Sequence, residues 1–196
     1  ANPVSTEEAL GLEPALNPSI REAIQVPDGT IDAFRLPMSF LSSAVHEGAL
    51  AFNFTEVVNI DRKNGTIGGV HVKNLKTGEH SYYKADAVVN AAGPWAGAVA
   101  SLADCHLPIT PTPGTMIAMN GRLCDMVISR LRPPGNGDIL VPQRKQCIIG
   151  TTEWTTDEPD FVFPREADID FLLDSGEAMV PGFRNQSIIA QWAAAR

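Results

Sequence analysis

The feature that most constrains the fold is the run at residues 86–97, DAVVNAAGPWAG, in which an apolar stretch meets a turn of very small residues. Its two consecutive valines are typical of a strand that is buried on both faces. Ala91, Ala92 and Gly93 carry almost no side chain, so a bulky group has room against the backbone there. Pro94 suits the first position of a helix. The run predicts the strand-to-helix end where open α/β sheets bind ligands, and an ordinary tight turn is the alternative.

Size, charge and cysteine content narrow the class of protein. The chain has 196 residues and a formal net charge of −8, and its Lys and Arg residues form no long run. This argues against nucleic acid, or an anionic membrane surface, as the main partner. Cys105, Cys124 and Cys147 are widely spaced and form no C-x-x-C pair. They are interpreted as reduced thiols, and no metal site is expected.

Four helices are expected from apolar periodicity and from the residues at their ends. The second is expected to end at Gly48, and the last has Pro164 at its start with Glu166 and Asp168 in its first turn. The predicted helices are residues 6–10, 36–48, 95–102 and 165–179.

The predicted strands fall into two groups. Asn64-Gly65 and Thr77-Gly78 are hairpin turn signals, so the three strands around them should form an antiparallel meander. The later strands are separated by prolines and predict an antiparallel or mixed sheet. The strands of the meander are 56–61, 67–73 and 80–84; the later strands are 115–119, 126–131, 139–141, 147–151 and 187–192; residues 50–54 and 86–93 are two further strands.

Several motifs resemble one family. VVNAAGPWAG at 88–97 resembles the second flavin-contacting strand of the superfamily of FAD-dependent amino-acid oxidases and glycerol-3-phosphate dehydrogenases. GDILVP at 137–142, followed by IIGTTE at 148–153, resembles the ILVP…IIGTT core of the glycerol-3-phosphate dehydrogenases. Within them the chain is most similar to the large subunit of the anaerobic, quinone-linked type, and the resemblance covers nearly the whole chain.

The resemblance implies an α+β or α/β fold in two parts. Residues 29–104 would form part of a Rossmann-like FAD-binding domain that carries the three-stranded meander as an insertion. Residues 1–28 and 105–196 would form part of a substrate-binding cap domain with an antiparallel or mixed sheet. No G-x-G-x-x-G turn follows a strand near the start, so we expect an internal fragment of a longer flavoenzyme. The isolated fragment is expected to lack FAD and to be inactive.

The resemblance also implies the residues that contact FAD. The backbone of Ala91, Ala92 and Gly93, with Trp95 beside it, would meet the cofactor. Val57, at the start of the meander, matches the position whose backbone meets the adenine. The flavin would perform the redox chemistry, while the protein would position and tune it.

Three residues are the candidates for binding substrate. Arg196 matches an arginine that contacts substrate in the family, and its planar guanidinium suits a phosphate; an exposed terminal arginine is the alternative. Because the sequence stops at Arg196, this residue is expected to be disordered. Thr151 follows a glycine at a strand end, where its hydroxyl would face a ligand or bond to backbone. Thr115 lies in the segment PGTM at 113–116, which matches a family turn near the substrate.

The same segment leaves the catalytic base unidentified. Pro113 replaces the lysine of the family turn, and Met116 stands where aerobic relatives have a histidine. Neither side chain is able to move a proton. Other cations are interpreted as structural: Arg35 as a partner of Asp32, and Arg130 and Arg132 as a solvated face, with a cationic wall as the alternative.

The leading hypothesis from the sequence is a flavoenzyme that oxidises sn-glycerol 3-phosphate to dihydroxyacetone phosphate. Partner subunits would carry the electrons to a membrane quinone, with the enzyme in the cytoplasm or peripheral at the inner face of the cell membrane. One alternative is an amino-acid or 2-hydroxy-acid oxidase of the same superfamily. The other is a non-catalytic module that docks partner subunits or senses a metabolite.

Overall fold

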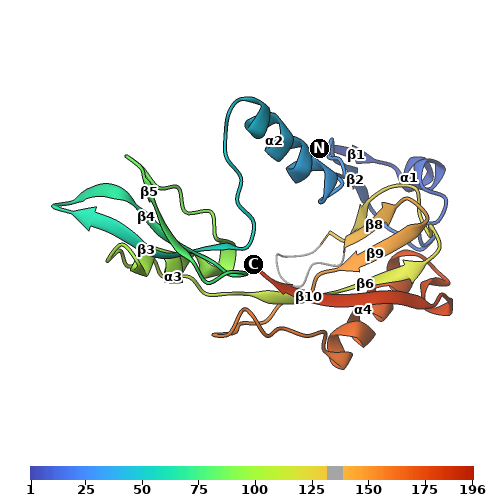
Figure 1. The fold of residues 1–196 in the computed structure, drawn as a ribbon. Coiled ribbons are helices and arrows are strands. Elements are labelled where there is room, and N and C mark those ends of the chain that lie inside the picture. Colours follow the sequence, from blue (N-terminus) through green and yellow to red (C-terminus); the bar gives the residue numbers. More distant parts are fainter. Residues whose placement is uncertain (132–138) are drawn as a thin grey trace. The chain divides into compact units, whose positions relative to one another are not determined.

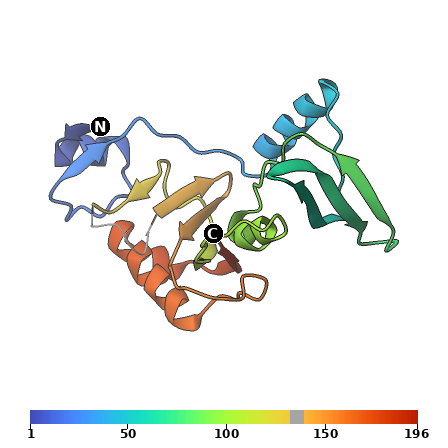
Figure 2. The ribbon, with the colours of Figure 1, turned by 90° about the vertical axis from the view of Figure 1, so that its left-hand side faces the viewer.

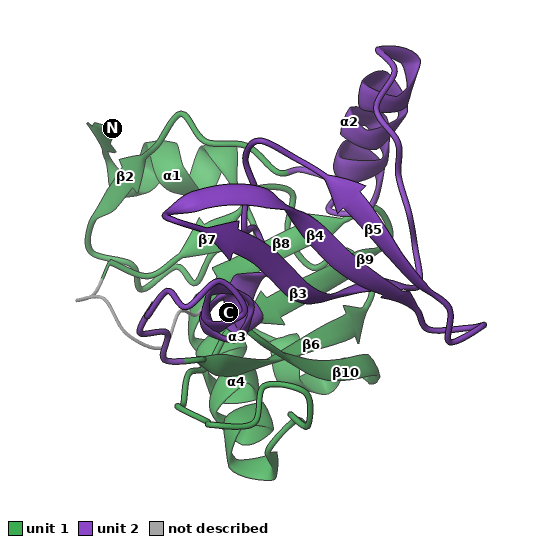
Figure 3. Ribbon diagram, turned by 60° about the vertical axis from the view of Figure 1, so that its left-hand side comes forward, with its two compact units in different colours: residues 1–30, 111–196 green, residues 31–110 purple. Residues whose placement is uncertain are grey.

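The computed structural model describes residues 1–131 and 139–196, which divide into two compact units. Unit 1 comprises residues 1–30 and 111–196, and unit 2 comprises residues 31–110 (Figure 3). The boundaries inferred from the sequence lie at 28/29 and 104/105, and the assignment of each part to a cofactor or a substrate domain stays a prediction. The described chain mixes helices with antiparallel sheets, which makes it α+β.

Unit 1 is built on a five-stranded sheet (Figure 1). Its strands are β6 (Pro113–Asn120), β7 (Ile128–Ser129), β8 (Ile139–Gln143), β9 (Gln146–Gly150) and β10 (Ile188–Ala195). They lie in the order β10-β6-β9-β8-β7, and every neighbouring pair is antiparallel. The sheet predicted as antiparallel or mixed is therefore antiparallel.

Helix α4 (Glu166–Met179) packs on one face of this sheet against β6 and β9 (Figure 2). Alternate residues of a strand point to the same face, so Ile117 and Met119 of β6 project together into the core. Leu172 of α4 and Phe183 of the following 3-10 turn η2 (Phe183–Asn185) are buried in the same cluster. The helix predicted at 165–179 is confirmed, and it supplies the apolar cover that the sheet requires.

The N-terminal part of unit 1 adds a small antiparallel pair. β1 (Asn2–Val4) pairs with β2 (Ala23–Gln25), and α1 (Thr6–Leu12) lies between them in sequence. The side chain of Ser5 caps α1 by accepting from the Glu8 backbone N–H at 3.1 Å. The helix at 6–10 is confirmed. The strand pair was not predicted, because two three-residue strands far apart in sequence carry no local turn signal.

Unit 2 contains the predicted meander. β3 (Thr55–Lys63), β4 (Thr66–Asn74) and β5 (His80–Lys84) form an antiparallel sheet in sequence order. Helix α2 (Arg35–His46) precedes it and ends just before Gly48, and η1 (Gly93–Trp95) with α3 (Ala96–Ser101) follow. The helices predicted at 36–48 and 95–102 are thus confirmed within a few residues. None of the helices in the described chain combines the length and the apolar character needed to cross a bilayer.

Three expected strands are wrong in whole or part. Residues 86–93 and 50–54 form no strand, and only Ile128–Ser129 of the predicted 126–131 is paired. A strand exists through its ladder of hydrogen bonds, and within the described residues no other strand lies against 86–92. Val89 is consequently 91% exposed, although its type suits a buried strand.

Candidate functional site

The turn at residues 90–95 in unit 2 is held by one side chain. The Asn90 amide donates to the Ala96 carbonyl at 2.8 Å, and its own oxygen accepts from the Ala92 N–H at 3.2 Å. The Trp95 N–H also donates to the Ala92 carbonyl, at 3.1 Å. The sequence interpretation passed over Asn90, although Asn before small residues is a known signal for side-chain-stabilised turns.

The backbone of this turn is open on its outer side. Gly93 has φ +57°, and a Cβ built on it would meet no atom within 4 Å. Ala91 and Gly93 are exposed, and Trp95 remains 42% exposed. Glycine is required at position 93 because of its positive φ. The small residues around it leave main-chain atoms uncovered beside the Trp95 indole, so a flat group has room to lie against them.

Val57 lies on the edge strand of the meander. It pairs with Val72 of β4, and the ladder becomes irregular between Val57 and Asn59. Within the described residues β3 pairs with β4 alone, so its outer edge presents backbone N–H and C=O groups. Such an edge is able to hydrogen-bond a heterocycle through main-chain atoms.

In unit 1, Thr115 and Thr152 share one carboxylate. Both hydroxyls donate to Oδ2 of Asp168, each at 2.9 Å, and both threonines are almost completely buried. The Thr115 N–H also donates to the Thr152 hydroxyl at 3.0 Å. Asp168 lies in the first turn of α4, so this cluster fixes the helix to β6 and to the segment after β9. Thr115 faces the helix, and its predicted contact with substrate gains no support from this geometry.

Thr151 lies on the other side of the same segment. Its hydroxyl donates to the Thr152 carbonyl at 3.1 Å, and the residue is half-buried. A Cβ on Gly114 would collide with the Thr151 hydroxyl and the Thr152 carbonyl. Gly114 thus permits the close approach of residues 151–152 to β6, and the Thr151 oxygen stays free to accept a further hydrogen bond.

The segment after β9 continues beside β6. The N–H groups of Thr152 and Trp154 donate to the carbonyls of Thr115 and Pro113, at 3.3 and 3.0 Å. Trp154 also stacks under the Arg165 guanidinium, whose Cζ lies 3.9 Å from the ring centroid. Residues 151–154 are therefore fixed along one edge of the start of β6.

Arg196 closes the other edge. Its N–H and C=O pair with Thr112, at 3.2 and 2.8 Å, so the β10–β6 ladder continues to the last residue. Its guanidinium forms an ion pair with Glu153 at 2.8 Å, and both side chains are about half exposed. The expectation of a disordered Arg196 is wrong, because the ladder orders its backbone. Arg196, Glu153 and Thr151 converge around the start of β6.

The remaining predicted cations have structural partners. Arg35 lies 3.7 Å from Asp32, as expected. Arg130 donates to the Ser175 hydroxyl of α4 at 2.9 Å, so it points toward the helix instead of joining a solvated face. Arg132 lies outside the described residues. Across the described chain no cluster of three or more His, Cys, Asp or Glu side chains is arranged to hold a metal ion.

Comparison with known proteins defines the class. Residues 2–196 match the family of FAD dependent oxidoreductases, known as DAO, and the chain belongs to this family. It is 37% identical to the anaerobic glycerol-3-phosphate dehydrogenase subunit A1 of Haloferax volcanii, over 92% of this chain and 32% of that protein. The chain thus spans about a third of the length of this curated relative.

Solved structures agree on the fold. The glycerol-3-phosphate dehydrogenase from Bacillus halodurans complexed with FAD superposes with a TM-score of 0.80 at 23% identity, covering 99% of this chain and 41% of that one. Glycine oxidase from Geobacillus kaustophilus superposes with a TM-score of 0.79 at 24% identity, covering 100% and 50%. These two similarities concern the fold alone, since enzymes with different substrates share it.

Proposed function

We propose that this chain is part of a FAD-dependent glycerol-3-phosphate dehydrogenase of the anaerobic type. The enzyme would oxidise sn-glycerol 3-phosphate to dihydroxyacetone phosphate. The observation that carries the proposal is the 37% identity to the Haloferax volcanii subunit A1 across 92% of the chain. Family membership supports the flavin, and the named relative supports the substrate.

The substrate phosphate is assigned to Arg196. Backbone hydrogen bonds with Thr112 fix its main chain beside the start of β6, and its guanidinium forms an ion pair with the half-exposed Glu153. A phosphate would take the place of that carboxylate, because both accept parallel bonds from the guanidinium. Thr151 would add a hydroxyl from the opposite edge of β6, and the Thr115–Thr152–Asp168 cluster would hold that edge in place.

FAD is assigned to unit 2. The open backbone at Ala91, Ala92 and Gly93, with Trp95 beside it, fits a flat ring that lies against main chain. The edge of β3 at Val57 fits hydrogen bonding to an adenine. The flavin, when bound, supplies the hydride-accepting chemistry, and this chain's residues bind and orient it.

Partners and location complete the proposal. The Haloferax relative is named as a subunit, which supports a multi-subunit enzyme. We propose that partner subunits pass the electrons to a membrane quinone and that the enzyme works in the cytoplasm, peripheral to the inner face of the membrane. No residue of this chain is assigned as the catalytic base, since neither Pro113 nor Met116 is able to take a proton.

The test uses the polypeptide extended at both ends to the length of its relatives. Under anaerobic conditions sn-glycerol 3-phosphate should bleach the flavin absorbance. Arg196→Ala should keep the oxidised flavin spectrum and raise the KM by roughly 100-fold, which corresponds to loss of a charge-assisted pair. Arg35→Ala, on the exposed α2, is the matched control and should leave the KM unchanged.

The same experiment separates the alternatives. The second candidate is an amino-acid or 2-hydroxy-acid oxidase of the same superfamily, because a substrate carboxylate would suit Arg196 as well as a phosphate does. If glycine or another amino acid bleached the flavin absorbance and sn-glycerol 3-phosphate did not, the result would support the amino-acid oxidase hypothesis. If the full-length polypeptide bound no flavin, the result would support the third hypothesis, a non-catalytic module that docks partner subunits. FAD bound to the purified 196-residue chain would refute the expectation that this piece alone is inactive.

A further inference from the structure

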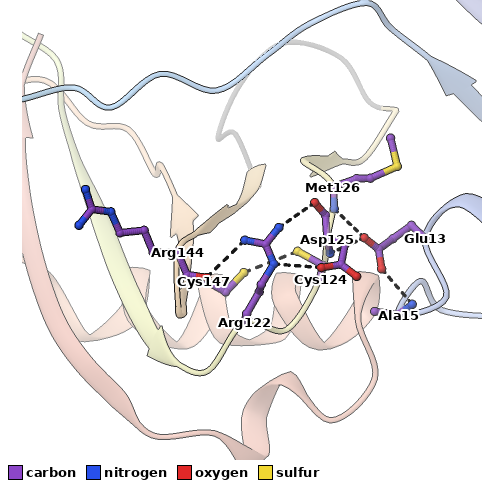
Figure 4. A network of polar contacts seen from close by, with 8 residues as sticks. All are labelled: Glu13, Ala15, Arg122, Cys124, Asp125, Met126, Arg144 and Cys147. Atoms are coloured by element: carbon purple, nitrogen blue, oxygen red, sulfur yellow. Dashed lines mark hydrogen bonds and ion pairs between the residues drawn. The ribbon is translucent and has the colours of Figure 1, made fainter. Parts of the chain in front are cut away.

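Two cysteines that are far apart in sequence meet in the core of unit 1 (Figure 4). The Sγ atoms of Cys124 and Cys147 lie 3.8 Å apart, and the two residues are 3% and 0% exposed. Cys147 is on β9, between Met119 of β6 and Pro142 of β8. Cys124 is in the connection between β6 and β7. The sequence spacing alone gave no reason to expect this pair.

The distance between the sulfurs is that of a non-bonded contact, and a disulfide would bring it to about 2.0 Å. Cys124 is the residue that is able to move toward Cys147 and close this distance. Asp125, Met126 and the next residue are exposed, so Cys124 lies directly beneath a surface segment, while Cys147 is fixed in the centre of the sheet. Local opening of a surface connection costs far less than opening the sheet.

Polar contacts hold that segment over the pair. The buried carboxylate of Glu13 accepts from the backbone N–H groups of Asp125 and Met126, at 2.6 and 2.7 Å. Arg122 donates to the Asp125 carboxylate at 2.9 Å and to the Arg144 carbonyl at 3.3 Å. These contacts keep Cys124 beside Cys147 when the segment is closed, which favours one specific pairing.

The acid–base state of the pair suits thiol chemistry. The hydrogen bond from Cys124 lowers the pKa of Cys147, helped by the Leu123 backbone N–H and the Arg122 guanidinium. The same shared proton, followed by burial, raises the pKa of Cys124. A thiol with a lowered pKa, beside a thiol that shares its proton, suits the first step of thiol–disulfide exchange.

We propose that Cys124 and Cys147 form a reversible intramolecular disulfide when a low-molecular-weight disulfide is the oxidant. The Cys147 thiolate attacks the oxidant and forms a mixed disulfide, releasing one small thiolate. Cys124 then attacks the Cys147 sulfur as a thiolate, and the second small thiolate leaves and takes up the Cys124 proton. The two protein thiols lose two electrons, and the small disulfide gains them. This modification site is independent of the proposed oxidoreductase activity.

Cys105 provides an internal comparison. It lies exposed in unit 2, with the Arg62 guanidinium 3.8 Å from its sulfur and no second cysteine beside it among the described residues. The same oxidant should leave Cys105 as a mixed disulfide, because nothing displaces the small thiol. Cys105→Ser removes this reaction and leaves the buried pair alone.

The experiment incubates the folded chain with bis(2-hydroxyethyl) disulfide and follows intact mass and peptide maps. Cys105→Ser should lose the mass of two hydrogens, lose both iodoacetamide-reactive thiols and yield a linked peptide that contains Cys124 and Cys147. Dithiothreitol should restore both thiols. In concentrated urea, the unmodified sequence should lose its preference for this pairing and distribute linkages among all three cysteines.

Two further variants keep the proposal falsifiable. Cys124→Ala in the Cys105→Ser background should never lose two hydrogens as a monomer. The peptide maps of the unmodified sequence give the same answer without any substitution. The proposal would be overturned if both thiols of Cys105→Ser stayed reduced, or if each formed a stable adduct without a disulfide between them. Cys124 and Cys147 would then be inert core side chains.

Discussion

The two units of this chain differ in how many of their apolar residues are buried. In unit 1, Ile117, Leu140, Leu172 and Phe183 are completely buried between one sheet and one helix. In unit 2, helix α2 has no buried residue, and Phe34 and Val89 are 85% and 91% exposed. Both units carry comparable apolar patterns in sequence, so pattern alone does not decide burial.

The difference lies in whether a complementary face is present. The α4 helix meets the sheet of unit 1 with an apolar stripe, and both faces leave water together. The α2 helix forms as expected, whereas the 86–92 segment forms no strand, and within the described residues no element covers either of them. Helix formation is therefore a local property here, whereas strand formation and burial both need a partner.

The largest effect is expected at Phe183. Phe183→Ala should destabilise unit 1 by about 3 to 5 kcal/mol, because it removes a completely buried ring and leaves a cavity. Phe40→Ala, on the exposed face of α2, should stay within about 0.5 kcal/mol. Urea unfolding followed by far-ultraviolet circular dichroism reports on the helices and strands of both units. Equal costs for the two alanines would abolish the contrast between the units.

The next effect is expected at Asp168. Asp168→Ala should cost about 2 to 3 kcal/mol, since the two buried hydroxyls of Thr115 and Thr152 lose their shared charged acceptor. Glu166→Ala, two residues earlier in the same turn, is the control, because its side chain is exposed and its loss should cost less than about 1 kcal/mol. The same urea titration measures both. If Asp168→Ala left the free energy of unfolding unchanged, the cluster would not hold α4 to the sheet.

A pair of glycines sharpens the comparison. Gly114→Ala in unit 1 should cost about 1 to 3 kcal/mol, because its Cβ would collide with the Thr151 hydroxyl and the Thr152 carbonyl. Gly93→Ala in unit 2 should cost about 1 kcal/mol through its positive φ alone, since the space beyond it is open. Circular dichroism melts would rank the two. A larger loss at Gly93 would contradict the open turn.

The smallest effect is a pH dependence at Glu177. Backbone N–H groups of Gly182 and Arg184 donate to its carboxylate, at 3.0 and 2.9 Å, and lower its pKa from the ordinary 4.5. A lowered folded-state pKa stabilises the fold above 4.5, and this contribution disappears as the pH falls through the folded-state value.

The matching variant is Glu177→Gln. Its urea midpoint should lie slightly below that of the unmodified chain at neutral pH, and the gap should close as the pH falls through the lowered folded-state pKa of Glu177. Glu166→Gln, exposed and at the other end of α4, is the control for a general loss of charge. A gap that widens on acidification would reverse the sign and refute the assignment.

Much of the fold was predictable because its signals are local. The Asn64–Gly65 turn fixed the meander, and Pro164 with the acidic first turn located α4. The strands at 50–54 and 86–93 failed because their composition suits a strand whose partner the described chain does not contain. The β1–β2 pair and the Cys124–Cys147 contact could not be found, since each joins positions that no local pattern links.

The candidate site divides in the same way. The motifs identified the family to which the chain belongs, because residue type and order are enough to match a family, and they selected Gly93, Thr151 and Arg196 as candidates. Only the tertiary structure showed that Thr115 turns toward Asp168, that Glu153 pairs with Arg196, and that Asn90 holds the turn before Trp95. Sequence alone determined the four helices, the three-stranded meander and the chemistry that the residues carry. The packing of strands that are distant in sequence decided which side chains meet, because those contacts depend on register and on facing surfaces.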